Sequence, residues 1–386
     1  MENTPSSQLE SFPQVAVGKF AWTALAGVFC VTALCPESAS AQTPGASAAA
    51  QRATESAVRQ AESMQQSQAL RDQQVKAAQS SDQPPETYPG ENQDLGPQVL
   101  LKQKQRKPLF EFSSDTMFTW TSNALSAGEP QDTGVTAETF SLALAPEEFE
   151  AFGGKLSLRA GYRHLLWVYD IAQTNHINPL NGSNFEMSTV FLGSSFSFKE
   201  NWNASLGLDF NRLLFQTRPW SLQHVADPSN WVEGYVEWNP NWSLSRNIPL
   251  GDKTSVSVTY NGSYHFTDLD PAVKTGGVAG VDMTKSNSGD KLDNALLVSL
   301  SYTPKDKWVL QPSLRFSHSL YTQPQVSPVH RMDRAFAPGL TCLWLPSPRW
   351  ALRWSVSGEF RHSNDPVSPN SSKVELGTGA TLTWKF

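Results

Sequence analysis

The chain has 386 residues, of which 39% are hydrophobic and 17% charged, and its formal net charge at pH 7 is −6. A weakly acidic protein is not attracted to polyanions. We therefore expect no nucleic-acid partner. Only three cysteines are present, and two of them lie within the first 35 residues. The rest of the chain holds Cys342 alone, which excludes an internal disulfide framework there.

Residues 1–41 have the pattern of an export signal. Lys19 precedes the apolar block FAWTALAGVFCVTALC at 20–35, and the following PESASAQ offers a small-x-small cleavage site after Ala41. A membrane anchor needs about 20 consecutive apolar residues, so an uncleaved anchor is the weaker alternative. We predict that 1–41 is a signal peptide, which leaves a mature chain with 29 basic and 33 acidic residues.

Residues 42–107 form a region that is rich in Ala, Gln and Ser, with Tyr88 as the sole aromatic residue. Such a composition cannot bury enough apolar surface to offset the entropy of ordering the chain. The stretch 46–79 contains strong helix formers and neither Gly nor Pro, which indicates a solvated helix or a weak coiled coil. We predict a helical or disordered extension and linker. It ends in the basic run KQKQRK (102–107), either a solvated tether or a contact for acidic lipid head groups.

From Pro108 onward apolar and polar residues alternate, and twelve of the thirteen tryptophans lie in this part. In KTSVSVTYNGSYHF, for example, Val256 and Tyr260 share one face while Ser257 and Asn261 share the other. A period of two predicts β-strands. We expect twelve, over 109–121, 136–146, 155–168, 185–198, 202–215, 232–245, 253–266, 292–303, 307–321, 332–345, 349–362 and 374–386.

The connections between these strands alternate in length. KEN, PKDK, PSPR and IPLGDK are short, whereas the intervening connections run from about ten to more than twenty residues. The second connection, EEFEAFGG, belongs to the short set but is longer than its companions. Aromatic residues flank the short turns on the apolar face, as expected at a lipid–water boundary. These interface candidates are Phe198, Trp202, Tyr302, Trp308, Trp344, Trp350, Trp384 and Phe386.

Residues 108–386 resemble the outer-membrane β-barrels of Gram-negative bacteria. The resemblance rests on the export signal, the alternating strands, the unequal connections, the clustered aromatics and a terminal strand, VELGTGATLTWKF, that ends in Phe386. It implies an all-β fold, a transmembrane antiparallel β-barrel of about twelve strands with porin-like character and both termini in the periplasm. It also implies that the barrel-insertion machinery reads the C-terminal strand.

A closed barrel follows from physics as well, because lipid cannot hydrogen-bond a free strand edge. Strand alternation then predicts which charged side chains line the lumen, where ions of both signs can pair. These candidates are Glu111, Asp115, Arg159, Arg163, Asp209, Glu233, Glu237, His265, Arg315, Arg353, Glu359 and Arg361, together with Asn211 and Lys385. They either select solutes in a pore or fill a narrow interior with salt bridges.

Chemical sites are poorly indicated. Outer-membrane lipid hydrolases carry a His-x-Ser pair, and no histidine here is followed two residues later by serine; His362 and Ser363 are adjacent and point to opposite faces. Five aspartates at 268, 270, 282, 290 and 293 could share Ca²⁺, but they lack the spacing of a calcium loop, and a solvated loop is the stronger interpretation. We therefore predict no catalytic residues, no metal and no cofactor.

The function we expect is passive movement of small hydrophilic solutes through the lumen, with outer-membrane lipid around the barrel. A different class of function stays open. A non-conducting structural or adhesive barrel could bind a partner through its long loops or its extension, and a lipid hydrolase is the third alternative. The solute and the oligomeric state are not determined by the sequence.

Overall fold

The computed structural model describes residues 109–123, 132–146, 148–169, 184–199, 201–216, 231–269, 289–322, 330–365 and 370–386. The predicted export signal at 1–41 and the predicted extension at 42–107 lie outside the described residues. No helix within these ranges is long and apolar enough to cross a membrane.

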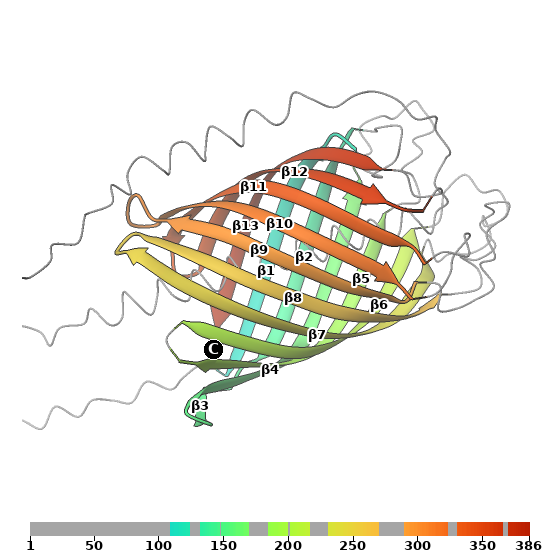
Figure 1. Ribbon diagram of the computed structural model, residues 1–386. Helices are drawn as coiled ribbons and strands as arrows, with labels where there is room; N and C mark the ends of the chain where they lie inside the picture. The colour runs from blue at the N-terminus through green and yellow to red at the C-terminus, as the bar shows by residue number, and fades with distance from the viewer. Residues whose placement is uncertain are drawn as a thin grey trace, which may run out of the picture. The chain divides into compact units, whose positions relative to one another are not determined.

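Twelve long antiparallel strands and one short strand make up a single sheet (Figure 1). The strands are β1 (Phe110–Thr121), β2 (Thr133–Leu144), β3 (Phe149–Ala151), β4 (Gly154–Tyr169), β5 (Phe185–Phe198), β6 (Trp202–Gln216), β7 (Trp231–Gly251), β8 (Thr254–Leu269), β9 (Lys291–Tyr302), β10 (Trp308–Tyr321), β11 (Met332–Ser347), β12 (Trp350–Ser363) and β13 (Ser371–Lys385). The prediction of an all-β, twelve-strand barrel is confirmed.

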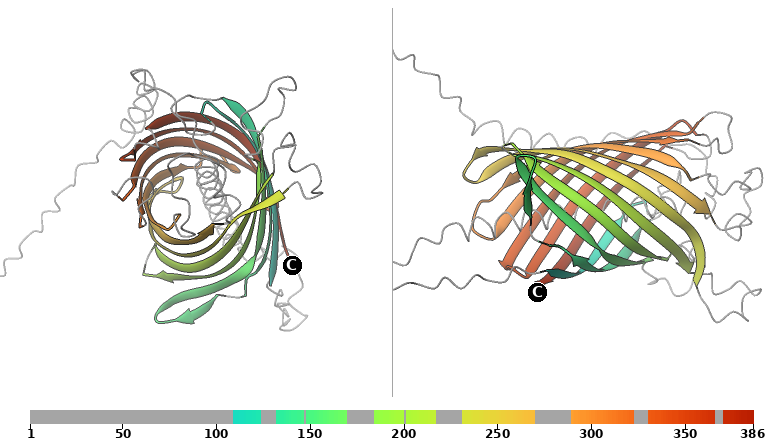
Figure 2. Two further views of the ribbon diagram at one scale, coloured as in Figure 1. Left: turned by 90° about the vertical axis from the view of Figure 1, so that its right-hand side faces the viewer. Right: turned by 90° about the horizontal axis from the view of Figure 1, so that it is seen from below.

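The sheet closes on itself, because β2 pairs with β4 and β1 pairs with β13. Viewed along its axis in Figure 2 (left), the strands surround a central lumen. The seam between the first and last strands continues to the final residue, where the Phe110 amide donates to the Phe386 carbonyl at 2.9 Å and the two rings stack at 5.9 Å. Phe386 is 59% exposed, so this terminal ring lies on the outer surface rather than in a protein core.

The connections fall on two ends of the barrel. The turn end carries the short turns, the start of β1 and the end of β13, and the loop end carries the longer connections. The long second connection is explained by β3, a three-residue strand that folds back on β4 through Phe152 and Gly153, both at positive φ. The expected turn IPLGDK is shorter than predicted, since β7 continues to Gly251 and pairs with β8 up to that point.

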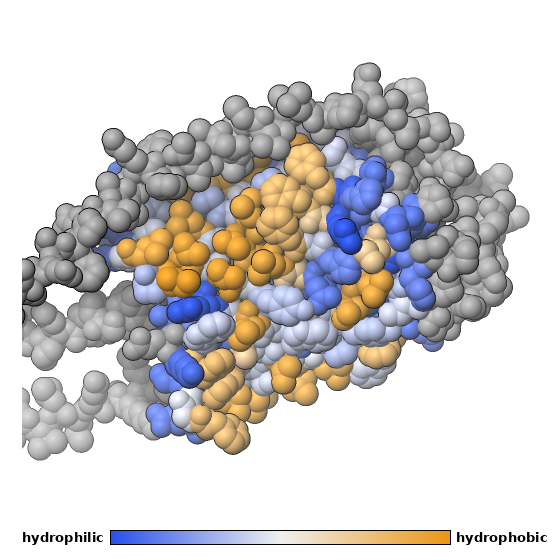
Figure 3. Space-filling view, in the orientation of Figure 1, coloured by the Kyte–Doolittle hydropathy of each residue, from blue (hydrophilic) through white to orange (hydrophobic). Residues whose placement is uncertain are grey.

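Alternation gives the wall two different faces. Large apolar side chains stand exposed on the outer surface, among them Val190, Leu192, Leu206 and Trp238 at 51–67% exposure. Figure 3 shows apolar side chains gathered over the strands on the visible outer face. Side chains of the opposite parity, such as Asp115, point to the interior and are buried. A surface of this kind is stable where acyl chains cover it.

Candidate functional site

The inner wall is the candidate functional site, because it brings ionisable groups from ten strands into one enclosed space. Of the predicted lumen-lining residues, Asp115, Asn211, Glu237, His265, Arg353, Glu359 and Arg361 are buried, and Glu111, Arg159, Arg163, Asp209 and Arg315 are half-buried. Lys385, at the turn end, keeps 39% of its side chain exposed. The side chain of Glu233 lies outside the described residues, beyond an irregularity in the pairing of β6 with β7.

A chain of polar contacts crosses five neighbouring strands near the loop end. The Thr189 hydroxyl donates to Asn211 Oδ1 at 2.7 Å, and Asn211 Nδ2 donates to Glu237 Oε1 at 3.0 Å. His265 then lies between two carboxylates, with Nδ1 at 3.0 Å from Glu237 Oε1 and Nε2 at 3.1 Å from Asp293 Oδ2. Each of these five side chains therefore has a polar partner on a neighbouring strand, as burial requires.

The same chain of contacts continues onto β10 and β11. Lys291 Nζ lies 3.0 Å from Asp293 Oδ2 and 5.8 Å from the centre of the Tyr321 ring. The Arg331 guanidinium covers the same ring at 4.4 Å. Two cations thus contact one aromatic ring, and each cation–π contact is favourable where water is excluded.

Asp333 is the anion at the centre of the next group. Its carboxylate accepts from Arg331, with Nη2 to Oδ2 at 2.6 Å, and from Arg361 on the adjacent strand. The side chains of these three residues are 4–6% exposed. We call the connected set the ion-pair belt; its members are Glu237, His265, Lys291, Asp293, Arg331, Asp333 and Arg361.

A second set of ion pairs lies toward the turn end. Arg353 Nη2 lies 3.3 Å from Asp115 Oδ2, and both side chains are almost fully buried. Glu111 Oε1 on β1 accepts from Arg159 Nη2 at 2.8 Å, and Glu111 Oε2 forms an ion pair with Lys385 Nζ at 3.3 Å. These contacts cross between strands that are far apart in the sequence, so they join the barrel seam on its inner side.

The sequence analysis misses several charged residues of the inner wall. The belt residues Lys291 and Arg331, and Lys373 near the start of β13, each lie one residue before a predicted strand, so alternation was not extended to them. Asp333 lies inside a predicted strand, but the next residues on the same face are Ala335, Ala337 and Gly339. Because these residues are not polar, alternation did not predict that this face lines the lumen. Extending each strand by one or two residues at its loop end would have found the three cations.

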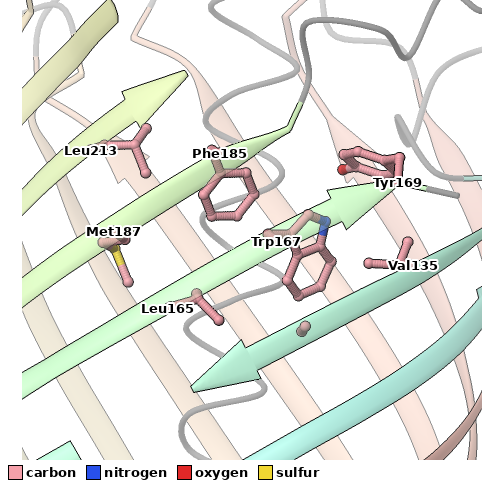
Figure 4. Close-up of a cluster of buried hydrophobic side chains, with 8 residues drawn as sticks. Val135, Leu165, Trp167, Tyr169, Phe185, Met187 and Leu213 are labelled. Atoms are coloured by element: carbon pink, nitrogen blue, oxygen red, sulfur yellow. The ribbon is translucent and has the colours of Figure 1, made fainter. Parts of the chain in front are cut away.

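The prediction of a hydrophilic inner face is wrong for part of the wall. At the loop end, one group of buried apolar residues faces the interior (Figure 4), and we call it the loop-end patch. It comprises Val135, Ala137, Leu165, Trp167, Tyr169, Phe185, Met187 and Leu213. A second, the turn-end patch, comprises Val309, Leu343, Leu345 and Ala351. The inner wall is therefore amphipathic.

The register shows why the loop-end patch belongs to the inner wall. Trp167 and Leu165 have the same parity as Arg163 and Arg159, whereas the exposed Tyr162 has the opposite parity. Trp167 pairs with Phe185 across β4 and β5, and the two rings stack at 5.7 Å. An aromatic surface of this kind facing an interior is a packing surface rather than a wetted one.

The predicted interface aromatics gather near the turn end. Trp308 stacks on Trp344 at 5.9 Å, Phe198 stacks on Trp202 at 6.4 Å, and the Arg349 guanidinium covers Trp384 at 4.6 Å. The exposed members are Tyr302, Trp308, Trp350, Trp384 and Phe386, and Phe198, Trp202 and Trp344 are half-exposed. All eight lie on the outer parity of their strands, close to a short turn.

One arrangement resembles a nucleophile with its base. The Ser263 hydroxyl lies 3.1 Å from His265 Nε2, and Glu237 faces the other ring nitrogen. However, Asp293 lies at the same 3.1 Å from Nε2, so both ring nitrogens face carboxylates and neither is left to take the serine proton. His362 and Ser363 are on opposite faces of β12, with the His362 side chain exposed.

Two of the five aspartates considered as calcium ligands have other contacts, and a third, Asp268, is exposed on β8. Asp290 Oδ1 accepts from the Thr267 amide at 2.8 Å, and Asp293 is a member of the ion-pair belt. Asp270 and Asp282 lie outside the described residues. Among the described residues, no group of three or more His, Cys, Asp or Glu side chains could hold a metal ion.

No protein-family model and no curated protein matches the chain. Among solved structures, an outer membrane channel from Pseudomonas putida F1 is similar over 72% of this chain and 96% of its own, with 9% identity and a TM-score of 0.44. The β domain of the Bordetella autotransporter BrkA covers 72% of this chain and 100% of its own, at 9% identity and a TM-score of 0.38. The KdgM porin covers 70% and 98%, at 8% identity and a TM-score of 0.32.

The assignment of the chain follows from its own geometry. A closed antiparallel barrel with an apolar outer surface and paired charges inside is the architecture of a transmembrane β-barrel, the fold that outer-membrane barrels have. The prediction of this fold from the sequence is confirmed.

Proposed function

We propose that this protein is a passive channel for small hydrophilic solutes in the outer membrane. The observation that carries the proposal is the set of charged side chains of both signs that face the enclosed interior from β1, β4 and β6–β13. A charged lining replaces part of the hydration shell of a polar solute as the solute crosses the membrane, which is how pores admit and select such solutes. The proposed transport involves no chemical step.

We also infer the orientation of the barrel. Twelve strands return the chain to the end at which it began, so the start of β1 and the end of β13 lie together at the turn end. Barrels of this class have short periplasmic turns and longer external loops, which supports a periplasmic turn end. We further propose that the insertion machinery reads β13 together with Phe386, which follows it and completes the seam with Phe110.

A second candidate is a non-conducting barrel with a structural or adhesive role. It is favoured by the deep burial of Arg331, Asp333 and Arg361, because paired charges that fill the interior leave little free passage. In that case the loops or the extension would carry the function.

Planar-bilayer conductance distinguishes the two candidates. The purified, folded protein would be reconstituted, and its current would be recorded over a range of salt concentrations. A variant that lacks residues 46–79, the helix-forming part of the predicted extension, would be recorded in the same way. The channel proposal predicts discrete current steps that scale with salt. Two folded proteins that both give no steps would overturn it and favour the structural barrel.

A further inference from the structure

The inner wall carries apolar surface where a solute pathway would be wet. In the loop-end patch, Phe185 and Leu213 are fully buried and Trp167 is 7% exposed. In the turn-end patch, Val309 and Leu343 are 1% exposed. The wall of a barrel is a single layer of strands, so an inward side chain is covered from within by neighbouring inward side chains, as Trp167 covers Phe185, or by material that fills the lumen at its level.

We propose that the segment 46–79 of the same chain lies inside the lumen as a helix and packs against these two patches. The conductance part of this inference rests on the proposed channel function, whereas the packing part does not. Two residues separate the region 42–107 from β1, which starts at the turn end. A covalent tether of this length keeps the segment at high effective concentration near that opening.

The length of the segment fits the barrel. A helix of the 34 residues from 46 to 79 is about 51 Å long at 1.5 Å per residue. A strand of 16 residues such as β4 is about 53 Å long at 3.3 Å per residue, and its tilt shortens the barrel along the axis. One helix can therefore reach from the turn-end patch to the loop-end patch.

The side-chain pattern of the segment matches an amphipathic lumen. Ala50, Ala53, Ala57, Ala61 and Met64 recur at spacings of three and four, which places them on one side of a helix. Alanine allows close approach to flat surfaces such as the stacked rings of Trp167 and Phe185. The segment therefore has a narrow apolar stripe that can pack against the apolar patches of the inner wall.

The opposite side of the same helix is charged. Arg52, Glu55, Arg59 and Glu62 lie away from the alanine stripe by the same helical spacing. The ion-pair belt faces the lumen from β7–β12, across from the loop-end patch on β2 and β4–β6. A helix that sets its alanine stripe on the patch turns these charges toward a wall that carries both signs.

Cross-linking tests the packing directly. In a Cys342→Ser background, Ala50→Cys, Ala53→Cys, Ala57→Cys or Ala61→Cys would each be combined with Leu165→Cys in the patch. The matched control is Leu166→Cys, the next residue of β4, which points to the outer surface. The reagent is a bis-maleimide about one helix diameter, or roughly 10 Å, in length. Folding of every variant would be verified by heat-modifiable mobility.

The proposal predicts an intramolecular cross-link from at least one alanine position to residue 165 and none to residue 166. Equal yields at 165 and 166, or no product with 165 from any position, would overturn it. Because this readout does not depend on current, it stands even if the barrel proves non-conducting.

Solvent labelling shows whether another segment covers the patch. A Met187→Cys variant would be treated with a water-soluble maleimide in the full chain and after deletion of 46–79. We expect at least a tenfold faster reaction after the deletion. Protection that is unchanged by the deletion would mean that a loop covers the patch, and this result would contradict the proposal.

Conductance measures the consequence for transport. The variants are Ala57→Glu, which charges the stripe, and Gln66→Glu, which adds the same charge to the opposite side of the helix. Deletion of 46–79 and Ala57→Glu should both raise the single-channel conductance at least twofold, and Gln66→Glu should not. If deletion leaves existing current steps unchanged, the helix does not fill the channel. If no variant conducts, the channel function fails and cross-linking alone decides the docking.

Discussion

At the loop end, the inner wall has two unlike halves. Over β2 and β4–β6 it is the loop-end patch, and over β7–β12 it is the ion-pair belt. The belt is satisfied within the wall, since each cation has its carboxylate on its own or an adjacent strand. The patch has no charges to pair, and its apolar side chains leave water only when neighbouring rings or material in the lumen cover them. The stability of this barrel therefore depends both on its wall and on its contents.

Loss of one belt member should have the largest effect. In Asp333→Ala, the buried guanidinium groups of Arg331 and Arg361 lose the carboxylate that they share. Because both cations stay buried without this carboxylate, we expect the free energy of unfolding to fall by about 3–5 kcal/mol. Urea unfolding in lipid vesicles, followed by gel mobility, measures this change. The control Arg334→Ala, an exposed position on the same strand, should change little; equal effects would contradict the account of the belt.

Shortening a side chain of the loop-end patch distinguishes burial by the wall from burial by the segment proposed to lie in the lumen. Phe185→Ala should lower the free energy of unfolding of the full chain by about 3 kcal/mol, the typical cost of deleting a buried ring. In a chain without residues 46–79 the same substitution should cost much less, since the ring would already lack its cover. The matched control on β5 is Val190→Ala, which is 56% exposed on the outer face and should cost the same in both chains. A Phe185 effect that is independent of the deletion would show that the wall alone buries this ring.

A smaller effect is expected at His265. His265→Gln keeps one donor but removes the ring that joins Glu237 to Asp293, and we expect a loss of about 2 kcal/mol, typical of a hydrogen bond to a charged group. His164→Gln is the matched control, because His164 is half-exposed and lies 3.8 Å from Glu186. Its loss should stay under about 1 kcal/mol. Equal losses at the two histidines would argue against a connected belt.

The smallest effect concerns ion selectivity at the turn end. Lys385→Glu reverses a charge that is 39% exposed beside Glu111, so the opening should become more attractive to cations. In a salt gradient, we expect the reversal potential to shift by a few millivolts toward cation selectivity. Lys305→Glu, in the exposed turn before β10, should leave it unchanged. A shift of the same size in both variants would place the solute pathway elsewhere.

Much of the fold could be predicted from the sequence, because lipid enforces strict alternation on the outer face. All twelve strands lie where the period of two predicted them, and Phe386 finds its place at the seam with β1. Strand ends were less predictable. β7 continues to Gly251 through Pro249, a residue that usually indicates a turn, and β3 depends on a tight positive-φ turn at Phe152.

The inner wall was predictable only in part. Charges inside a strand, such as Asp115 and Arg353, follow from alternation. The pairing of Arg331 with Asp333 and Arg361 depends on register between strands, which one sequence does not contain. The loop-end patch was missed for a different reason. The segment LRAGYRHLLWVY at 158–169 begins with alternating residues and ends in a continuous apolar run. In such a run the period of two is lost, so the sequence does not indicate which side chains face lipid and which face the lumen.

The central claim is that alternate residues of each strand face acyl chains and an enclosed interior. A spin label carried by single cysteines at positions 188–193 of β5, in a Cys342→Ser background reconstituted in vesicles, tests this claim directly. Collision with oxygen, which concentrates in the bilayer, should be high at 190 and 192 and low at 189 and 191, matching exposed Val190 and Leu192 and buried Thr189 and Phe191. Oxygen accessibility without this period of two would contradict the account.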